Sequence, residues 1–144
     1  MFLGQYRHTL DEKGRLTIPA KFRDALANGA YLTQGFDRNL RLITQADFEA
    51  MAERLSRLSM TDPDIRQLRR LIFSTASEVQ LDRLGRTLVP QFLRTFAELN
   101  SDAVIVGVGE AIEIWSPEAW AEQENQLQDA EANAQRFAEL DIII

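Results

Sequence analysis

The chain has 144 residues, 45% of them hydrophobic, and a formal net charge of −6. This length supports one domain of ordinary size or two small ones, and the absence of cysteine excludes disulfide bonds and thiolate chemistry. The sequence has no apolar run of the roughly 20 residues that a membrane helix requires, and no export signal opens it. We therefore expect a soluble cytoplasmic protein that binds no membrane.

The acidic charge is concentrated toward the C-terminal end. Residues 1–109 contain 15 Lys and Arg against 13 Asp and Glu, whereas residues 110–144 contain one Arg against nine acidic residues. A local positive field attracts phosphate even where the total charge is negative. The overall balance therefore does not exclude nucleic acid as a partner.

The first strand is predicted over residues 5–10, where Tyr6, His8 and Leu10 alternate with Arg7 and Thr9. Because His8 is the only histidine, a site that uses it would need carboxylates brought in by the fold. We expect instead a packed strand histidine.

Residues 10–23, LDEKGRLTIPAKFR, read as the end of a strand, a tight turn, a second strand and the start of a helix. Asp11 is placed to accept a bond from the backbone two residues on, and Gly14 supplies the positive φ that closes the turn. Pro19 ends the second strand because it has no N–H, and its fixed φ suits a helix start. Arg15 is thereby placed beside an exposed turn.

The same unit recurs 71 positions later, at residues 81–94, as LDRLGRTLVPQFLR. Six of the fourteen positions are identical, which indicates that the chain contains two copies of one unit. The identical pairs are Leu10 and Leu81, Asp11 and Asp82, Gly14 and Gly85, Arg15 and Arg86, Pro19 and Pro90, and Arg23 and Arg94.

The remaining pattern predicts further strands over residues 31–33 and 40–43 and helices that begin after Thr44 and at Asp62-Pro63. A last, acidic helix is expected over residues 117–140. We divide the chain into a first repeat (5–47), a helical connection (48–75), a second repeat (76–119) and an acidic C-terminal helix (120–144).

Two copies are too few for a solenoid. A pseudo-twofold β-barrel flanked by helices is the economical alternative, because each half can cover the apolar strand faces and open strand edges of the other. We therefore predict an α+β fold built on a duplicated barrel.

The Leu-Asp-x-x-Gly-Arg-x-x-x-Pro pattern resembles the swapped-hairpin DNA-binding domains of the SpoVT and AbrB kind. Its duplication in a chain that opens MFLGQYRHTLDEKGR is similar to the MraZ family, and the resemblance covers nearly the whole chain. It implies a duplicated swapped-hairpin barrel and a bacterial transcriptional regulator associated with the nucleoid. The implied activity is regulation of the cell-division and cell-wall gene cluster, including its own promoter, by binding repeated promoter boxes, and we expect repression rather than the alternative, activation.

The resemblance also implies a homo-oligomeric ring, and the apolar residues 142–144 and the inter-repeat helix favour oligomerisation as well. The expected partner is double-stranded DNA, because β-ribbons fit the major groove and Arg can bond guanine with two hydrogen bonds. Asp11, Gly14, Asp82 and Gly85 are predicted to structure the turns. The predicted DNA-binding residues are Arg7, Lys13, Arg15, Lys21, Arg23, Arg83, Arg86 and Arg94.

The two hairpins are unequal in charge. Lys13 and Lys21 of the first copy correspond to Leu84 and Phe92 of the second, where Phe92 is expected to pack. The first hairpin should therefore supply most of the attraction for DNA. A competing interpretation of the turn is an ion pair between Asp11 and Arg15 that pins it without any role in binding.

Other functions compete with this interpretation. An antitoxin-like protein would bind DNA through the hairpins and a protein through the acidic tail. A small hydrolase would use Asp11, Asp82 and His8, but the second copy has Val79 at the position of His8. Arg66, Arg69 and Arg70 form a basic helix face that is either solvated, an interprotomer contact or a DNA contact. We expect no catalytic residue, no metal ion and no cofactor.

Overall fold

The computed structural model, which describes residues 1–142, shows a mixed α+β fold in which two antiparallel sheets are joined by helices. One sheet has six strands in the order β1-β7-β8-β4-β3-β5, and the other pairs β2 with β6. The strands are β1 (Gln5–Thr9), β2 (Arg15–Thr17), β3 (Ala30–Gln34), β4 (Leu40–Thr44), β5 (Ser77–Val79), β6 (Arg86–Leu88), β7 (Asp102–Gly107) and β8 (Ala111–Trp115). The helices are α1 (Ala20–Leu26), α2 (Gln45–Ser56), α3 (Pro63–Thr75), α4 (Gln91–Phe96), α5 (Pro117–Leu127), α6 (Ala130–Phe137) and the 3₁₀ helix η1 (Ala138–Leu140).

The two copies exchange strands. Strand β1 of the first copy pairs with β7 of the second, and β5 of the second copy pairs with β3 of the first. The equivalent strands β4 and β8 pair with each other, as do β2 and β6. The opposed pairs Leu40 with Ile114 and Leu42 with Ile112 show the pseudo-twofold relation, because each pair maps onto the other when the copies are interchanged.

One apolar core serves both copies. Leu16, Ile18 and Leu93 are fully buried in the same cluster as Leu42 and Ile112 of the large sheet. A core of this kind cannot be divided between the copies, since each of them contributes side chains to it throughout.

The closed barrel predicted from the sequence is not observed in the described residues. Strands β1 and β5 are the edges of the six-stranded sheet, and β2 and β6 form a separate ladder. A single bridge between Leu10 and Leu16 links the first strand to this ladder. Pro19 and Pro90 directly precede α1 and α4, and a residue without an N–H cannot extend the ladder far enough to close the sheet.

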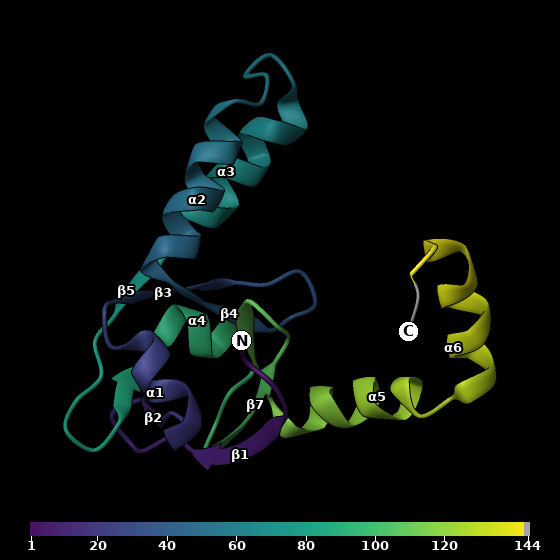
Figure 1. Ribbon diagram of the computed structural model, residues 1–144. Coiled ribbons are helices and arrows are strands. Elements are labelled where there is room, and N and C mark those ends of the chain that lie inside the picture. The colour runs from purple at the N-terminus through teal and green to yellow at the C-terminus, as the bar shows by residue number, and fades with distance from the viewer. Residues whose placement is uncertain (143–144) are drawn as a thin grey trace.

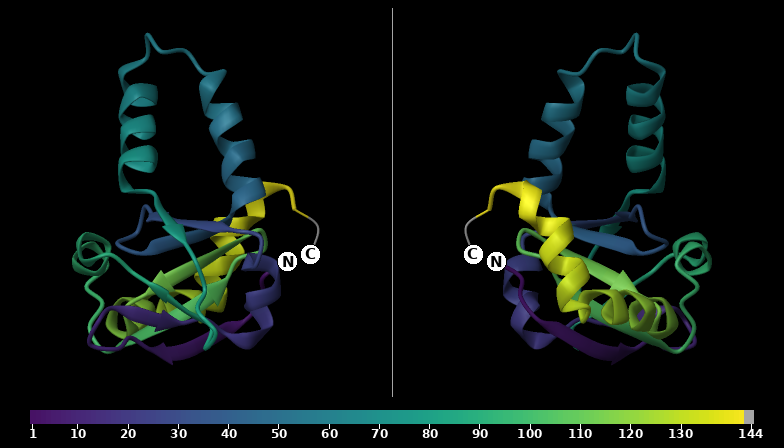
Figure 2. Two further views of the ribbon diagram at one scale, coloured as in Figure 1. Left: turned by 90° about the vertical axis from the view of Figure 1, so that its left-hand side faces the viewer. Right: turned by 90° about the vertical axis from the view of Figure 1, so that its right-hand side faces the viewer.

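Helices α2 and α3 form a hairpin that projects from the sheet, as Figures 1 and 2 show. Thr44 caps α2 by accepting a bond from the backbone N–H of Asp47, and Asp62 caps α3. Phe48 anchors the base of the hairpin by stacking on Tyr31, with ring centroids 4.4 Å apart. The two predicted helix starts therefore lie where the capping residues indicated.

The acidic helix expected over residues 117–140 is interrupted. Asp129 accepts a bond from the backbone N–H of Ala132 and so caps a new helix, which separates α5 from α6. Trp120 holds the start of α5 against the six-stranded sheet through Trp115 of β8 and Gln5 of β1, but neither α5 nor α6 has a fully buried residue. Figure 1 shows this C-terminal arm (residues 117–142) leading away from the core. Residues 143 and 144 of the predicted apolar end lie outside the described residues.

Within residues 1–142, no helix combines the length and the apolar character needed to cross a membrane.

Candidate functional site

The ladder of β2 and β6 forms a short ribbon with one inner and one outer face. Leu16 lies opposite Thr87, and both side chains are buried against the core. Side chains alternate between the faces of a strand, and directly opposed residues share a face. The outer face therefore carries the remaining side chains of the ladder, which are Arg15, Thr17, Arg86 and Leu88.

Each turn beside the ribbon is organised by one aspartate. Asp11 Oδ1 accepts bonds from the backbone N–H groups of Lys13 and Arg15, at 3.0 and 2.9 Å. Asp82 Oδ1 does the same for Leu84 and Arg86, at 2.9 Å each. Gly14 and Gly85 have φ values of 81° and 76°, which residues with a Cβ adopt only under strain. The two turns are thus built from the same local interactions.

The arginines on the outer face are paired with these aspartates. Arg15 Nε donates to Asp11 Oδ2 at 2.6 Å, and Arg86 Nε donates to Asp82 Oδ2 at 2.9 Å. Arg86 Nη1 also lies 3.7 Å from Asp11 Oδ2 of the other copy. The ion pair weighed as an alternative from the sequence is therefore present. It leaves terminal nitrogen donors on Arg15 for a further partner, because an arginine has five N–H groups.

The turn geometry also controls the acidity of the two aspartates. Backbone N–H donation from Arg15 lowers the pKa of Asp11 below its ordinary value, and the Arg15 side chain contributes to the same effect. Arg86 lowers the pKa of Asp82 in the same way. Both carboxylates are therefore charged at neutral pH, and they orient the two guanidinium groups.

Arg23 and Arg94 form an arginine clasp, in which each guanidinium lies against the turn of the other copy. Arg23 Nε donates to the carbonyl of Ile18, and Arg94 Nε donates to the carbonyl of Val89, both at 2.9 Å. Each guanidinium lies against the glycine of the other copy: a Cβ on Gly14 would stand 2.7 Å from Arg94 Cζ, and a Cβ on Gly85 would overlap Arg23. The structure thus engages these two predicted DNA-binding residues in holding the copies together.

The other predicted DNA-binding residues lie around the ribbon or apart from it. Lys13 and Arg83 are exposed in the two turns, and Lys21 is exposed in the first turn of α1. Arg7 lies on the edge strand β1, where its side chain is 63% exposed and pairs with Asp102 at 3.2 Å. The structure therefore brings together the arginines of the motif, whereas Arg7 is held by β7.

Three apolar side chains of the second copy are exposed near the ribbon, and none of them is among the DNA-binding residues predicted from the sequence. They are Leu84, Leu88 and Phe92, at 65%, 56% and 51% exposure. The expectation that Phe92 packs is wrong, because Leu93 is the residue of α4 that is buried in the core. Lys21, which is exposed at the equivalent position of the first copy, was the signal that could have predicted the exposure of Phe92.

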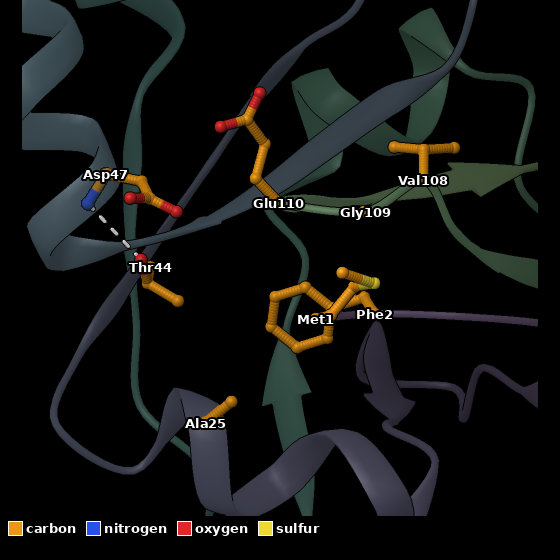
Figure 3. A pocket seen from close by; sticks show the side chains of 8 residues that line it. All are labelled: Met1, Phe2, Ala25, Thr44, Asp47, Val108, Gly109 and Glu110. Carbon is orange, nitrogen blue, oxygen red and sulfur yellow. Dashed lines mark hydrogen bonds between the residues drawn. The ribbon is translucent and has the colours of Figure 1, made fainter. Parts of the chain in front are cut away.

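The described residues show no group of three or more His, Asp or Glu side chains arranged to hold a metal ion. His8 is half-buried, and this burial, followed by the charge of Arg23, lowers its pKa. A separate hollow of about 480 Å³, drawn in Figure 3, lies between the chain start, α1 and the start of α2. Its ionisable side chains are Asp47 and Glu110, which repel phosphate.

Comparison with known proteins assigns the chain to a family. The family model described as "MraZ protein, putative antitoxin-like" matches twice, over residues 1–71 and 72–141. The chain belongs to the MraZ family. A protein of Roseiflexus castenholzii named "Transcriptional regulator MraZ" is 50% identical over 139 residues, 96% of this chain and 95% of that protein. A protein of the same name from Thermomicrobium roseum is 47% identical over 97% of this chain and 99% of that protein.

These matches confirm the resemblance drawn from the duplicated motif. The relatives are named as transcriptional regulators, which are not a class of enzyme, and this chain carries the MraZ unit twice. The ribbon and its two turns are the part of the molecule where the two copies of the repeated sequence motif of this chain come together.

Substitution of Gly85 by Ala should destabilise the protein by about 2 to 3 kcal/mol, because a positive φ is strained for alanine and the Arg23 clasp is displaced. Gly109→Ala is the matched control, since Gly109 also has a positive φ but an added Cβ there meets no atom within 4 Å. Urea unfolding should therefore show a larger loss for Gly85→Ala. Equal losses in the two variants would contradict the clasp.

The lowered pKa values of Asp11 and Asp82 predict a contribution to stability that is present at neutral pH. It is lost as the pH falls below the ordinary carboxyl pKa and through the lower value of the folded state. Replacing both Asp11 and Asp82 by Asn keeps an oxygen acceptor in each turn but removes the carboxyl groups that titrate. The free energy of unfolding, followed from about pH 6 to about pH 2, should fall less steeply in the double variant. Parallel pH profiles would argue against this role.

Proposed function

We propose that this protein is a sequence-specific DNA-binding repressor that acts on repeated boxes in the promoter of the cell-division and cell-wall gene cluster, including its own promoter. The observation that carries the proposal is the pair Arg15 and Arg86 on the outer face of one ribbon, each oriented by an aspartate. The strand exchange between copies supports a fold of the swapped-hairpin kind, although the sheet is open.

The ribbon has two strands and outward-facing arginines, as expected of a major-groove reader. A two-stranded β-ribbon fits the major groove, where arginine bonds the O6 and N7 atoms of guanine. Lys13, Lys21 and Arg83 are exposed around the ribbon and would meet phosphates, which fix register without reading sequence. Arg23 and Arg94 would act indirectly by holding the turns in place.

The first copy should dominate this contact. Arg15 is paired with one aspartate, whereas Arg86 lies between Asp82 and Asp11 and is more buried, with 26% of its side chain exposed against 36% for Arg15. The lysines are also confined to the first copy. Specific recognition would therefore depend on Arg15 more than on Arg86.

The C-terminal arm supports assembly into a homo-oligomeric ring. Leu127, Phe137, Leu140 and Ile142 are exposed along it, and its helices have no fully buried residue. Apolar surface of this kind is stabilised by a neighbouring copy, and head-to-tail contacts close into rings when the rotation permits. A ring would present several ribbons to repeated boxes and raise the overall affinity by about 10² or more. Such a regulator would work in the cytoplasm, at the nucleoid.

An antitoxin-like function is the second candidate. It is favoured by the acidic character of the same arm, which could bind a basic protein while the ribbon binds DNA. The family description also contains the words "antitoxin-like". Co-purification of a stoichiometric basic partner through the arm would support this candidate.

Arg15→Ala should lower the affinity for the chain's own upstream DNA by about tenfold or more, the value of one base-edge contact. Arg86→Ala should cause a smaller loss. Both variants should keep the fold, because surface ion pairs contribute only about 0 to 1 kcal/mol. Mobility-shift titration measures the affinities, with circular dichroism as the folding control and Arg57→Ala, at the exposed end of α2, as the matched arginine control. A larger loss at Arg86 would reverse the assigned asymmetry, and no shift by the unaltered protein would overturn the proposed function.

Light scattering at micromolar concentration should give a mass that is a multiple of 16.4 kDa. Replacing Phe137 and Leu140 by Asp should reduce that mass, because charged side chains oppose burial of the arm. Replacement of Leu3, an exposed leucine outside the arm, serves as the control. A 16.4 kDa species alone in the unaltered protein would refute the ring.

A further inference from the structure

We propose that Leu88 is a specificity-determining residue that reads the C5-methyl group of thymine beside the base pair contacted by Arg15. The inference rests on the proposed function, since it requires the outer face of the ribbon to enter the major groove. It adds apolar contact, a second kind of base recognition, to a face whose other proposed contacts are made by charged side chains.

The position of Leu88 follows from the ladder register. Leu88 lies directly opposite Arg15, and the two residues share the outer face with Thr17 and Arg86. The side chains of opposed residues in such a ladder start about 4.5 to 5.5 Å apart at Cβ. A partner that covers this part of the outer face would therefore lie close to both Arg15 and Leu88, which is 56% exposed.

The chemistry of the groove limits what Leu88 can contact there. Base edges in the major groove present hydrogen-bond donors and acceptors, and the thymine methyl group is their one apolar feature. A leucine pressed against a donor or acceptor would cover a polar group without giving it a partner, which is unfavourable. Contact with a thymine methyl removes apolar surface from water on both sides.

The two halves of the ribbon differ at this point. The residue equivalent to Leu88 in the first copy is Thr17, which lies opposite Arg86 and carries a hydroxyl as well as a methyl group. The strong apolar contact is thus placed beside Arg15, the arginine with a single acidic partner, and not beside Arg86. One half of each promoter box would then be recognised by the Arg15 guanidinium and by the contact of Leu88 with a thymine methyl group.

The experiment compares one DNA duplex in two forms. The segment of the chain's own upstream DNA that the protein protects is made with thymine and, by amplification with dUTP, with uracil, which lacks only the methyl group. The unaltered protein should bind the uracil form about fourfold more weakly for each methyl contacted, the value of one buried methyl or methylene group. Leu88→Ala should bind both forms with the same affinity.

Leu3→Ala is the matched control, because Leu3 is also an exposed leucine, at 62%, but lies outside both the ribbon and the C-terminal arm. It should keep the full preference for thymine, which removes any general effect of uracil on duplex shape from the comparison. Equal binding of both duplexes by the unaltered protein would overturn the proposal while leaving the proposed function intact. A preference for thymine that persists in Leu88→Ala would do the same, as would a loss of oligomer mass in Leu88→Ala without any change in that preference. Failure to bind the thymine duplex at all would instead refute the proposed function.

Discussion

The pairing of backbone between the two copies is the interaction on which the rest of the structure depends. Each copy places its first strand beside the other copy, and the N–H groups of Ile18 and Val89 bond to the carbonyls of Gly85 and Gly14. Buried backbone groups without partners are costly, so neither copy can leave this arrangement without losing them. The ribbon of β2 and β6 exists only because both copies contribute one strand to it.

This exchange has a direct consequence for the candidate site. A turn of a few residues would be mobile by itself, but here each is closed by its own aspartate and held by an arginine of the other copy. Arg15 and Arg86 are therefore oriented by bonds that already exist in the free protein, and the proposed recognition of DNA would lose little entropy by ordering them. Two of the repeated arginines support the site, and the other two face outward from it.

Fusion of the two copies into one chain allows the halves of the site to diverge. Identical subunits would have to carry the same residue on both sides of the twofold axis, whereas this chain has Thr17 on one strand and Leu88 on the other. The same freedom places lysines around the first turn and apolar side chains around the second. A pseudo-symmetric scaffold thus supports an asymmetric surface, and the shared core is unaffected because the divergent side chains point to solvent.

The sequence by itself determined the features that depend on neighbouring residues. The duplication was predictable from the repeated residues alone. The aspartate and glycine of each turn and the caps at Thr44 and Asp62 were predictable because their bonds join residues at most four positions apart. The cap at Asp129 was equally local but was missed within a long polar stretch. Only the tertiary structure decided that the sheet stays open and that Arg23 and Arg94 support the opposite turns. These outcomes depend on contacts between residues more than 60 positions apart, and no local pattern specifies which partner a strand or a guanidinium has at that separation.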